Sequence, residues 1–127
     1  MDTRKLIETY YQLANAGDWD AWADLFAVDQ VMDEQVAGHI EGRENLRTVV
    51  HGFPEVFATF KNVPRHIIVD PDGRQAGAVS HVSATTPAGA SIEVDVMNYF
   101  RIADGQIAYM SNYHDPGPVR TALAAGS

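Results

Sequence analysis

The sequence predicts an α+β fold in which helices dominate the first half and one antiparallel sheet forms the second half. Of the 127 residues, 46% are hydrophobic and 20% are charged, which is the composition of one ordinary globular domain spanning residues 1–127. The apolar period changes from 3.6 in the first half to 2 in the second, which favours helices first and strands afterwards. The expected order is helix, helix, strand, helix and four strands, a layered α+β arrangement.

Two helices are expected at the N-terminus. The first, over residues 4–16, ends before Gly17, because glycine commonly ends a helix in left-handed geometry. Asp18 can cap the second helix, which continues to Ala27. The apolar faces consist of Leu6, Tyr10, Leu13 and Ala14 in the first helix and of Trp22, Leu25 and Phe26 in the second.

A short strand over Val31 to Val36 carries the most informative carboxylate in the sequence. Met32, Glu34 and Val36 share one face of this strand, and Asp33 and Gln35 point the other way. Glu34 is therefore the one polar residue on an inward stripe. A shift of one residue in the strand register would exchange the faces and turn Asp33 inward instead.

The remaining elements follow from an apolar stripe and three turn sequences. Leu46, Val49, Val50 and Phe53 mark a third helix, and Pro54 is suited to restarting a turn that carries Phe57 and Phe60. Four strands run roughly from 62 to 69, 75 to 86, 90 to 102 and 106 to 114, separated by Pro71-Asp72-Gly73, Pro87-Ala88-Gly89 and Asp104-Gly105. An apolar tail, Val119 to Ala125, is expected to form a helical turn over one end.

The inward face of the third long strand is also interrupted by one polar residue. Val94, Val96, Phe100 and Ile102 share a face with Asn98, so the Asn98 side chain is expected to point inward. For the strand over residues 75–86, the alternation does not show which face points inward. Both of its alternating sets, Val79-His81-Ser83 and Ser80-Val82-Ala84, mix polar and apolar residues.

Several classes of function are disfavoured by composition and by missing motifs. Nine Lys and Arg against 17 Asp and Glu give a net charge of −8, which argues against nucleic-acid or anionic-membrane partners. With no cysteine there is no disulfide, thiolate metal site or thiol nucleophile. Phosphate-binding glycine loops, a G-x-S-x-G elbow and an H-E-x-x-H motif are absent, so neither a cofactor nor a metal site is expected. No apolar leader is visible, so a cytoplasmic protein is expected.

Four strings, spread over nearly the whole chain, resemble a known family. They are Tyr10 to Asp18 (YYQLANAGD), Leu25-Phe26-Ala27, Tyr99 to Ile107 (YFRIADGQI) and Asn112-Tyr113-His114-Asp115. Their order and spacing resemble the SnoaL-like branch of the nuclear transport factor 2-like superfamily, which includes polyketide cyclases, ketosteroid isomerase and limonene-epoxide-type hydrolases. The resemblance implies one SnoaL-like domain, a cone in which a strongly bent antiparallel sheet wraps around three helices. It also implies an apolar pocket at the wide end and a homodimer.

The resemblance also implies roles for individual residues. Compared with ketosteroid isomerase, Tyr10 matches a tyrosine donor, Glu34 the proton-abstracting carboxylate and Asn98 a protonated aspartic acid that donates to the substrate oxyanion. The family register turns His81 and Asn112 inward, where they would orient or reprotonate the substrate. The expected substrate-binding wall consists of Met32, Val79, Val96, Met110, Phe53, Phe57 and His114. The paired carboxylates of the epoxide hydrolases have no counterpart, because the matching positions hold His81, Val79 and Asn112.

These residues predict a cofactor-free enzyme that isomerises or cyclises an apolar carbonyl or polyketide-like compound. A carboxylate among apolar residues is a usable base, and neutral donors stabilise charge developing on a carbonyl oxygen. The alternative function is a non-catalytic binding protein for a hydrophobic metabolite, and a protein adaptor would need a large exposed apolar patch.

Each candidate site residue also has a structural interpretation. Tyr10 fits a core aromatic residue, and His81 fits a hydrogen-bonded core histidine. Asn98 and Asn112 could hold the strand register by hydrogen bonding across the pocket. The carboxylate of Glu34 could have a structural partner in Arg43, Arg47 or His81.

Overall fold

The computed structural model describes residues 1–125 and contains an α+β fold. Its helices are α1 (Thr3–Ala16), α2 (Trp19–Ala23), α3 (Arg43–His51), α4 (Phe53–Val56) and α5 (Gly117–Ala124). Its strands are β1 (Phe26–Glu34), β2 (Gly38–Glu41), β3 (Thr59–Val69), β4 (Gln75–Thr85), β5 (Ser91–Ala103) and β6 (Gln106–Tyr113). Among the described residues, no helix has the length and apolar character needed to cross a membrane.

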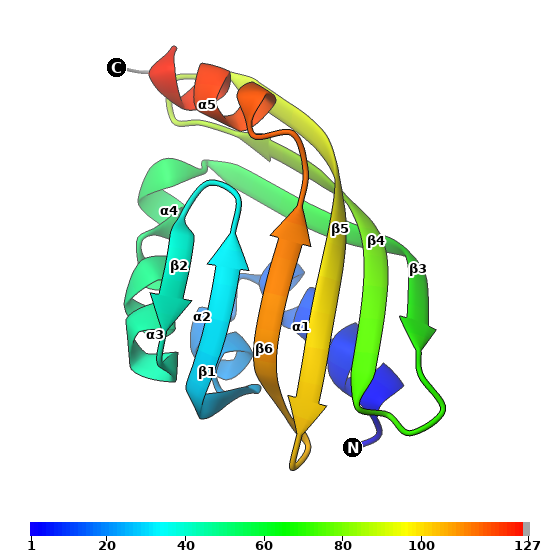
Figure 1. Ribbon diagram of the computed structural model, residues 1–127. Coiled ribbons are helices and arrows are strands. Elements are labelled where there is room, and N and C mark those ends of the chain that lie inside the picture. Colours follow the sequence, from blue (N-terminus) through cyan, green and yellow to red (C-terminus); the bar gives the residue numbers. More distant parts are fainter. Residues whose placement is uncertain (126–127) are drawn as a thin grey trace.

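All six strands form one sheet in the order β2-β1-β6-β5-β4-β3 (Figure 1). Neighbouring strands are antiparallel except β1 and β6, which run parallel with Met32 beside Met110. The expectation of a wholly antiparallel sheet is therefore wrong at this one pair. The parallel pair joins the N-terminal part of the chain to the C-terminal strand, and this pairing brings Glu34 close to Asn112 and His114.

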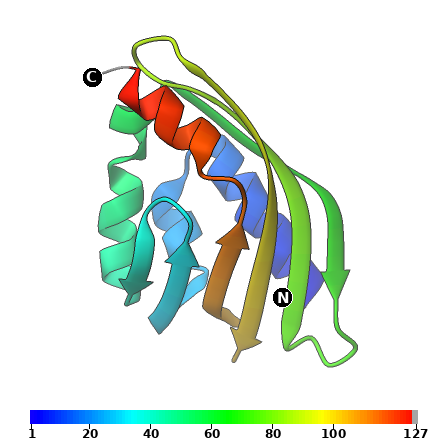
Figure 2. The ribbon, with the colours of Figure 1, turned by 45° about the horizontal axis from the view of Figure 1, so that its top comes forward.

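The sheet curls around the helices, with α1 inside the curve and α5 across one end (Figure 2). The α1 helix is capped by Asp2, whose carboxylate accepts from the Lys5 N–H, and it ends at Gly17 in left-handed geometry (φ 71°). Leu6, Ile7, Tyr10, Tyr11 and Ala14 form its buried face. They pack in the main core with residues of β1, β4, β5 and β6. The expected α+β class and bent sheet are confirmed.

Several elements differ from the sequence-based expectation. The second helix ends at Ala23 rather than Ala27, because Phe26 already begins β1 and the Leu25 carbonyl accepts from the Ile107 N–H of β6. The short strand β2 was not expected. Phe60 lies in β3 rather than in a turn, and the apolar tail forms the helix α5.

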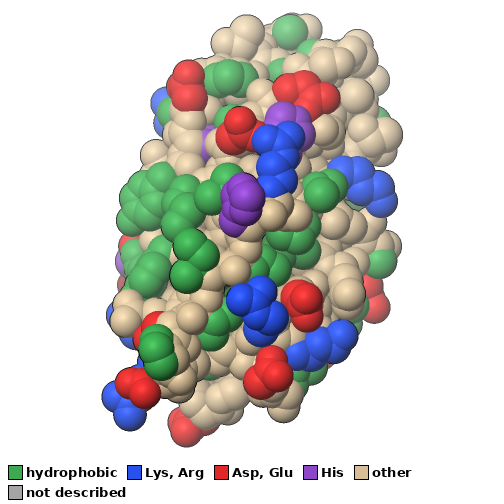
Figure 3. All heavy atoms as spheres, turned by 90° about the vertical axis from the view of Figure 1, so that its right-hand side faces the viewer, with side chains coloured by type: hydrophobic (Ala, Val, Ile, Leu, Met, Phe, Trp, Pro, Cys, Tyr) green, Lys and Arg blue, Asp and Glu red, His purple; other side chains and the backbone are tan. Residues whose placement is uncertain are grey.

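The edge strand β3 carries features that disfavour pairing with another sheet. The register shifts between Pro64 and His66, and proline has no N–H to donate. Lys61 and Arg65 add charge along the same edge. Figure 3 shows this side of the molecule as a mixture of apolar, basic and acidic side chains.

Candidate active site

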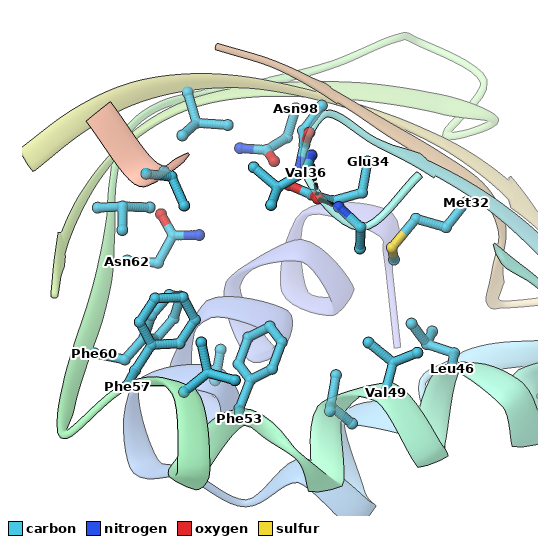
Figure 4. Close-up of a pocket in the computed structure, with 18 of the residues that line it drawn as sticks. Met32, Glu34, Val36, Leu46, Val49, Phe53, Phe57, Phe60, Asn62 and Asn98 are labelled. Carbon is cyan, nitrogen blue, oxygen red and sulfur yellow. Dashed lines mark hydrogen bonds between the residues drawn. The ribbon is translucent and has the colours of Figure 1, made fainter. Parts of the chain in front are cut away.

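A cavity of about 390 Å³ lies between the concave face of the sheet and the helices. Its walls are mostly apolar and come from nearly every element of the fold, including α5. In Figure 4, Met32, Glu34 and Asn98 lie on the sheet side, and Leu46, Val49 and Phe53 lie on the helix side. This volume is at the lower end of the range typical of pockets for small organic ligands.

Glu34 brings a carboxylate into this cavity from the end of β1. Its Oε2 accepts hydrogen bonds from the main-chain N–H of Val36 at 2.6 Å and from that of Ala37. Its Oε1 lies 3.3 Å from Asn112 Nδ2 and 3.4 Å from His114 Nε2. The side chain is 21% exposed. The predicted inward orientation of Glu34 is observed, and its polar neighbours hold the carboxylate in one position.

His114 lies beside this carboxylate with a side chain that is only 4% exposed. Its Nδ1 lies 3.0 Å from the Asp115 carbonyl, which can only accept, so Nδ1 carries a proton in this arrangement. The other ring nitrogen, Nε2, faces Glu34 Oε1 within hydrogen-bonding distance. His114 thus places a ring nitrogen where a proton can pass to or from the Glu34 carboxylate.

Asn112 connects this pair to the strands. It lies opposite Asn98 in the β5–β6 ladder, and its Oδ1 accepts from the Gln35 N–H at 3.1 Å. Its amide nitrogen donates to Glu34. Both ends of the amide are therefore used to hold the end of β1 and its carboxylate, which makes Asn112 a positioning residue.

The Tyr10 hydroxyl is a hydrogen-bond donor without a protein partner among the described residues. Tyr10 is 6% exposed and lines the cavity from α1. Burial, together with the nearby Tyr11 and the Glu34 carboxylate, raises the pKa of Tyr10 well above its ordinary value. The hydroxyl is therefore protonated at neutral pH and available to donate to a ligand.

Asn98 differs in this respect from the expected oxyanion donor. It is 1% exposed, and its Nδ2 donates to the Tyr11 hydroxyl at 2.9 Å and to Ser80 Oγ at 3.1 Å, with the Ala78 carbonyl at 3.4 Å. An amide has only two hydrogens, and both are engaged inside the protein. The geometry thus fits the structural interpretation of Asn98, a link between α1 and the sheet.

His81 and Val79 lie on the outer face of the sheet, so their predicted inward orientation is wrong. In the β4–β5 ladder Ala78 lies opposite Asn98 and Val82 opposite Val94, which turns the even-numbered residues of β4 inward. Instead, His81 Nδ1 lies 2.8 Å from Asp95 Oδ1, and His81 Nε2 lies 2.5 Å from Glu93 Oε2. Neither His81 nor Val79 borders the cavity.

The alternative in which Asp33 faces inward does not occur. Asp33 accepts from the Tyr109 hydroxyl at 2.6 Å and lies 2.6 Å from His39 Nδ1, on the outer face. Of the expected binding wall, Met32, Val96, Met110, Phe53, Phe57 and His114 line the cavity. Asn62, which also lines it, was not identified from the sequence, because β3 has no regular apolar alternation. Within residues 1–125, no group of three His, Asp or Glu is arranged to hold a metal ion.

Comparison with known proteins agrees with this architecture. The model of the SnoaL-like domain matches residues 7–110. The chain belongs to the SnoaL-like family. No curated protein matches the sequence.

Several solved structures share the fold at low sequence identity. A candidate polyketide cyclase from Pseudomonas putida has a TM-score of 0.88 and 21% identity, over 96% of this chain and 98% of the other. A candidate isomerase from Bacillus subtilis has a TM-score of 0.83 and 17% identity, over 98% and 94%. An epoxide hydrolase of the limonene type from M. tuberculosis has a TM-score of 0.80 and 17% identity, over 98% and 90%.

Proposed function

We propose that this protein is an enzyme that moves protons on an apolar carbonyl compound without a cofactor. The observation that carries the proposal is the pairing, in one largely apolar cavity, of a single carboxylate with a tyrosine hydroxyl that has no partner in the described part of the chain. A base and a neutral donor are the two groups needed to form an enolate from a ketone.

In this mechanism the Glu34 carboxylate takes a proton from the carbon next to the carbonyl. The electrons of the broken C–H bond move onto the carbonyl oxygen, which accepts a hydrogen bond from Tyr10. Return of the proton to a different carbon completes an isomerisation. Attack of the enolate carbon on a second carbonyl instead closes a ring and leaves an alkoxide, which takes the proton back from Glu34. His114 can pass its proton through Glu34, and Asn112 keeps the carboxylate in place.

The relatives support a flat carbonyl substrate. One structural neighbour, TerC, was co-crystallised with polyporic acid, and others are described as candidate polyketide cyclases. The four aromatic side chains on one side of the cavity, those of Trp19, Phe53, Phe57 and Phe60, offer a surface to such a molecule. A planar, ring-containing ketone is the substrate class we propose.

A second candidate function is non-catalytic binding of the same class of compound. The observation that favours it is the pair of main-chain N–H groups on Glu34 Oε2, which compensates the charge of the carboxylate in the absence of any reaction. Under this alternative Glu34 recognises a donor on the ligand and transfers no proton.

Deuterium exchange into beta-tetralone, a bicyclic ketone whose carbonyl ring is fused to a benzene ring, distinguishes the two functions. We expect the protein to accelerate exchange of the protons beside the carbonyl, and Glu34→Gln to slow it about a hundredfold or more, because the amide cannot accept the proton. Asp33→Asn, the neighbouring carboxylate on the outer face, is the matched control and should change the rate less than about twofold. Equal rates for wild type and Glu34→Gln would favour the binding protein.

A further inference from the structure

The Asn62 side chain is a buried amide that makes no hydrogen bond among the described residues. Asn62 is 8% exposed, and its Oδ1 is buried without a partner. Interior polar groups are almost always hydrogen-bonded, because an unpaired one loses its contacts with water and gains nothing in return. Gln30 also has a buried unpaired oxygen, but its amide nitrogen donates to the carbonyls of Ile40 and Gly42. In Asn62 both ends of the amide are unpaired.

The main chain at Asn62, in contrast, is firmly held. The Asn15 side chain, at the end of α1, accepts from the Asn62 N–H at 2.6 Å and donates to the Asn62 carbonyl at 2.9 Å. This double contact positions β3 against α1 and does not involve the Asn62 side chain. The main chain that carries the amide is thus held, while both polar ends of the side chain remain free among the described residues, as expected of a binding group on a fixed strand.

The side chains beside this amide in the sheet row and in the cavity are apolar. Asn62 lies in one row across the sheet with Val82 and Val94, and Phe57 and Phe60 are close to it in the cavity (Figure 4). No protein group in the row can use the amide, so its polar ends are available to a ligand that enters the cavity. The aromatic rings beside it favour a planar ligand.

Asn62 and Glu34 lie in different parts of the cavity. The row of Asn62 crosses β5 at Val94, whereas the Asn98–Asn112 row that contacts Glu34 crosses β5 four residues further on. Four residues of a strand span about 13 Å, which is the length of a molecule with several fused rings. The cavity therefore has two polar positions separated by an apolar middle.

We propose that Asn62 is the second polar anchor of the pocket, and that the ligand is a planar ring compound with a hydroxyl group at the end far from its reacting carbonyl. A hydroxyl both donates and accepts, so it can use the Oδ1 and the Nδ2 of one amide. This inference rests on the proposed function in one respect, the placement of the reacting carbonyl near Glu34. The contact between Asn62 and the ligand concerns binding alone and can be measured without any reaction.

The test compares beta-tetralone with its derivative that carries a hydroxyl on the aromatic ring far from the carbonyl. Binding is followed by fluorescence, since the two tryptophans of the chain, Trp19 and Trp22, line the cavity. We expect wild type to bind the hydroxylated ketone about five- to tenfold more tightly. Asn62→Leu, which has a similar shape and no polar group, should bring the two affinities within about twofold.

Glu34→Gln is the matched control, because it changes the other polar position. It should slow deuterium exchange and leave the five- to tenfold preference for the far hydroxyl in place. Urea unfolding shows whether Asn62→Leu is folded; we expect it to be at least as stable as wild type, because an unpaired buried amide has been removed. Asn62→Val, a better strand former, serves as a second variant.

Each outcome decides the inference. Loss of the preference in the position 62 variants supports the anchor. A wild type without the preference, or an Asn62→Leu variant that keeps it, overturns the anchor alone. Unfolding of both position 62 variants would assign Asn62 a structural role and overturn it too. If neither ketone binds wild type, the anchor and the proposed function fail together. A preference that depends on Asn62 without any deuterium exchange keeps the anchor and overturns the enzyme.

Discussion

Residues of the same type have different surroundings on the two faces of the sheet. Two consecutive carboxylates of β1 illustrate the difference. Glu34 points into the cavity, where it meets two main-chain N–H groups, Asn112 and His114. Asp33 points outward to His39 and Tyr109, beside solvent. Both carboxylates have partners, but only Glu34 borders a space from which most water can be excluded. A carboxylate with hydrogen-bond partners is therefore a candidate for catalysis because it borders the cavity, and the number of its partners matters less.

The outer face also holds the denser cluster of titratable groups. His81 lies between Asp95 and Glu93, Ser83 donates to Glu93, and Arg65 approaches Asp95 at 3.3 Å. Ion pairs at this exposure contribute little to stability. Fewer polar groups line the cavity on the concave side, and three of them, the Tyr10 hydroxyl, the Asn62 amide and the Trp22 indole N–H, have no protein partner among residues 1–125. Unpartnered donors are thus a better guide to the site than clustered charges.

The largest difference between the two faces is expected for a pair of tyrosines. Tyr10→Phe should slow deuterium exchange into beta-tetralone about a hundredfold, because the enolate oxygen loses its donor. Tyr109→Phe removes a hydroxyl that donates to Asp33 on the outer face and should change the rate less than about twofold. Neither the cavity nor the core depends on the Tyr10 hydroxyl for a hydrogen bond, so its loss should change unfolding stability by less than about 0.5 kcal/mol. Equal rates in the two variants would remove Tyr10 from the mechanism.

An intermediate effect is expected on stability. Tyr11→Phe removes the oxygen that accepts from Asn98 at 2.9 Å in the buried link between α1 and the sheet, which should cost about 1–2 kcal/mol in urea unfolding. Tyr99→Phe removes a hydroxyl that donates to Gln75 at the outer face, and should cost less than about 0.5 kcal/mol. A cost for Tyr99→Phe equal to that for Tyr11→Phe would contradict the distinction between the faces.

The smallest effect concerns pH and the outer cluster. The hydrogen bonds to Asp95 and Glu93 raise the pKa of His81 above its ordinary value of 6.5, while Arg65 opposes the shift. The protonated histidine is therefore favoured in the folded state. Its stabilisation is complete below about pH 6 and is lost as the pH rises through the raised pKa. Wild type should lose more stability than His81→Gln between about pH 6 and pH 8; parallel curves in urea unfolding would show that the cluster does not stabilise the fold.

Strong alternation made part of the site predictable. In β1 and β5 a polar residue interrupts an apolar face, so Glu34 and Asn98 could be oriented from the sequence, and both line the cavity. The turn sequences separated the four long strands close to their observed bounds. In these segments one face is buried and the other is solvated, which leaves a clear period of two.

The remainder depends on pairing between strands, which the sequence does not encode locally. Both faces of β4 mix polar and apolar residues, so its orientation is set by the pairing of Val82 with Val94, and a register taken from the family reversed His81. That both Asn98 hydrogens are used became visible only with Tyr11 and Ser80 in place, from 87 and 18 residues away in the chain. Asn62 gave no signal because the edge strand β3 is polar along much of its length.

The contact between Asn15 and the main chain of Asn62 has a consequence for how this protein could acquire new ligands. Because the attachment is made through peptide groups, it does not depend on the side chain at position 62, and only proline, which has no N–H, would remove one of its hydrogen bonds directly. Exchange of that one side chain would alter what the interior recognises while the scaffold stays as it is. A substitution at position 62 can therefore change which ligand binds without changing the contact that holds the fold together. Position 62 is a suitable starting point for redesigning the pocket toward other molecules.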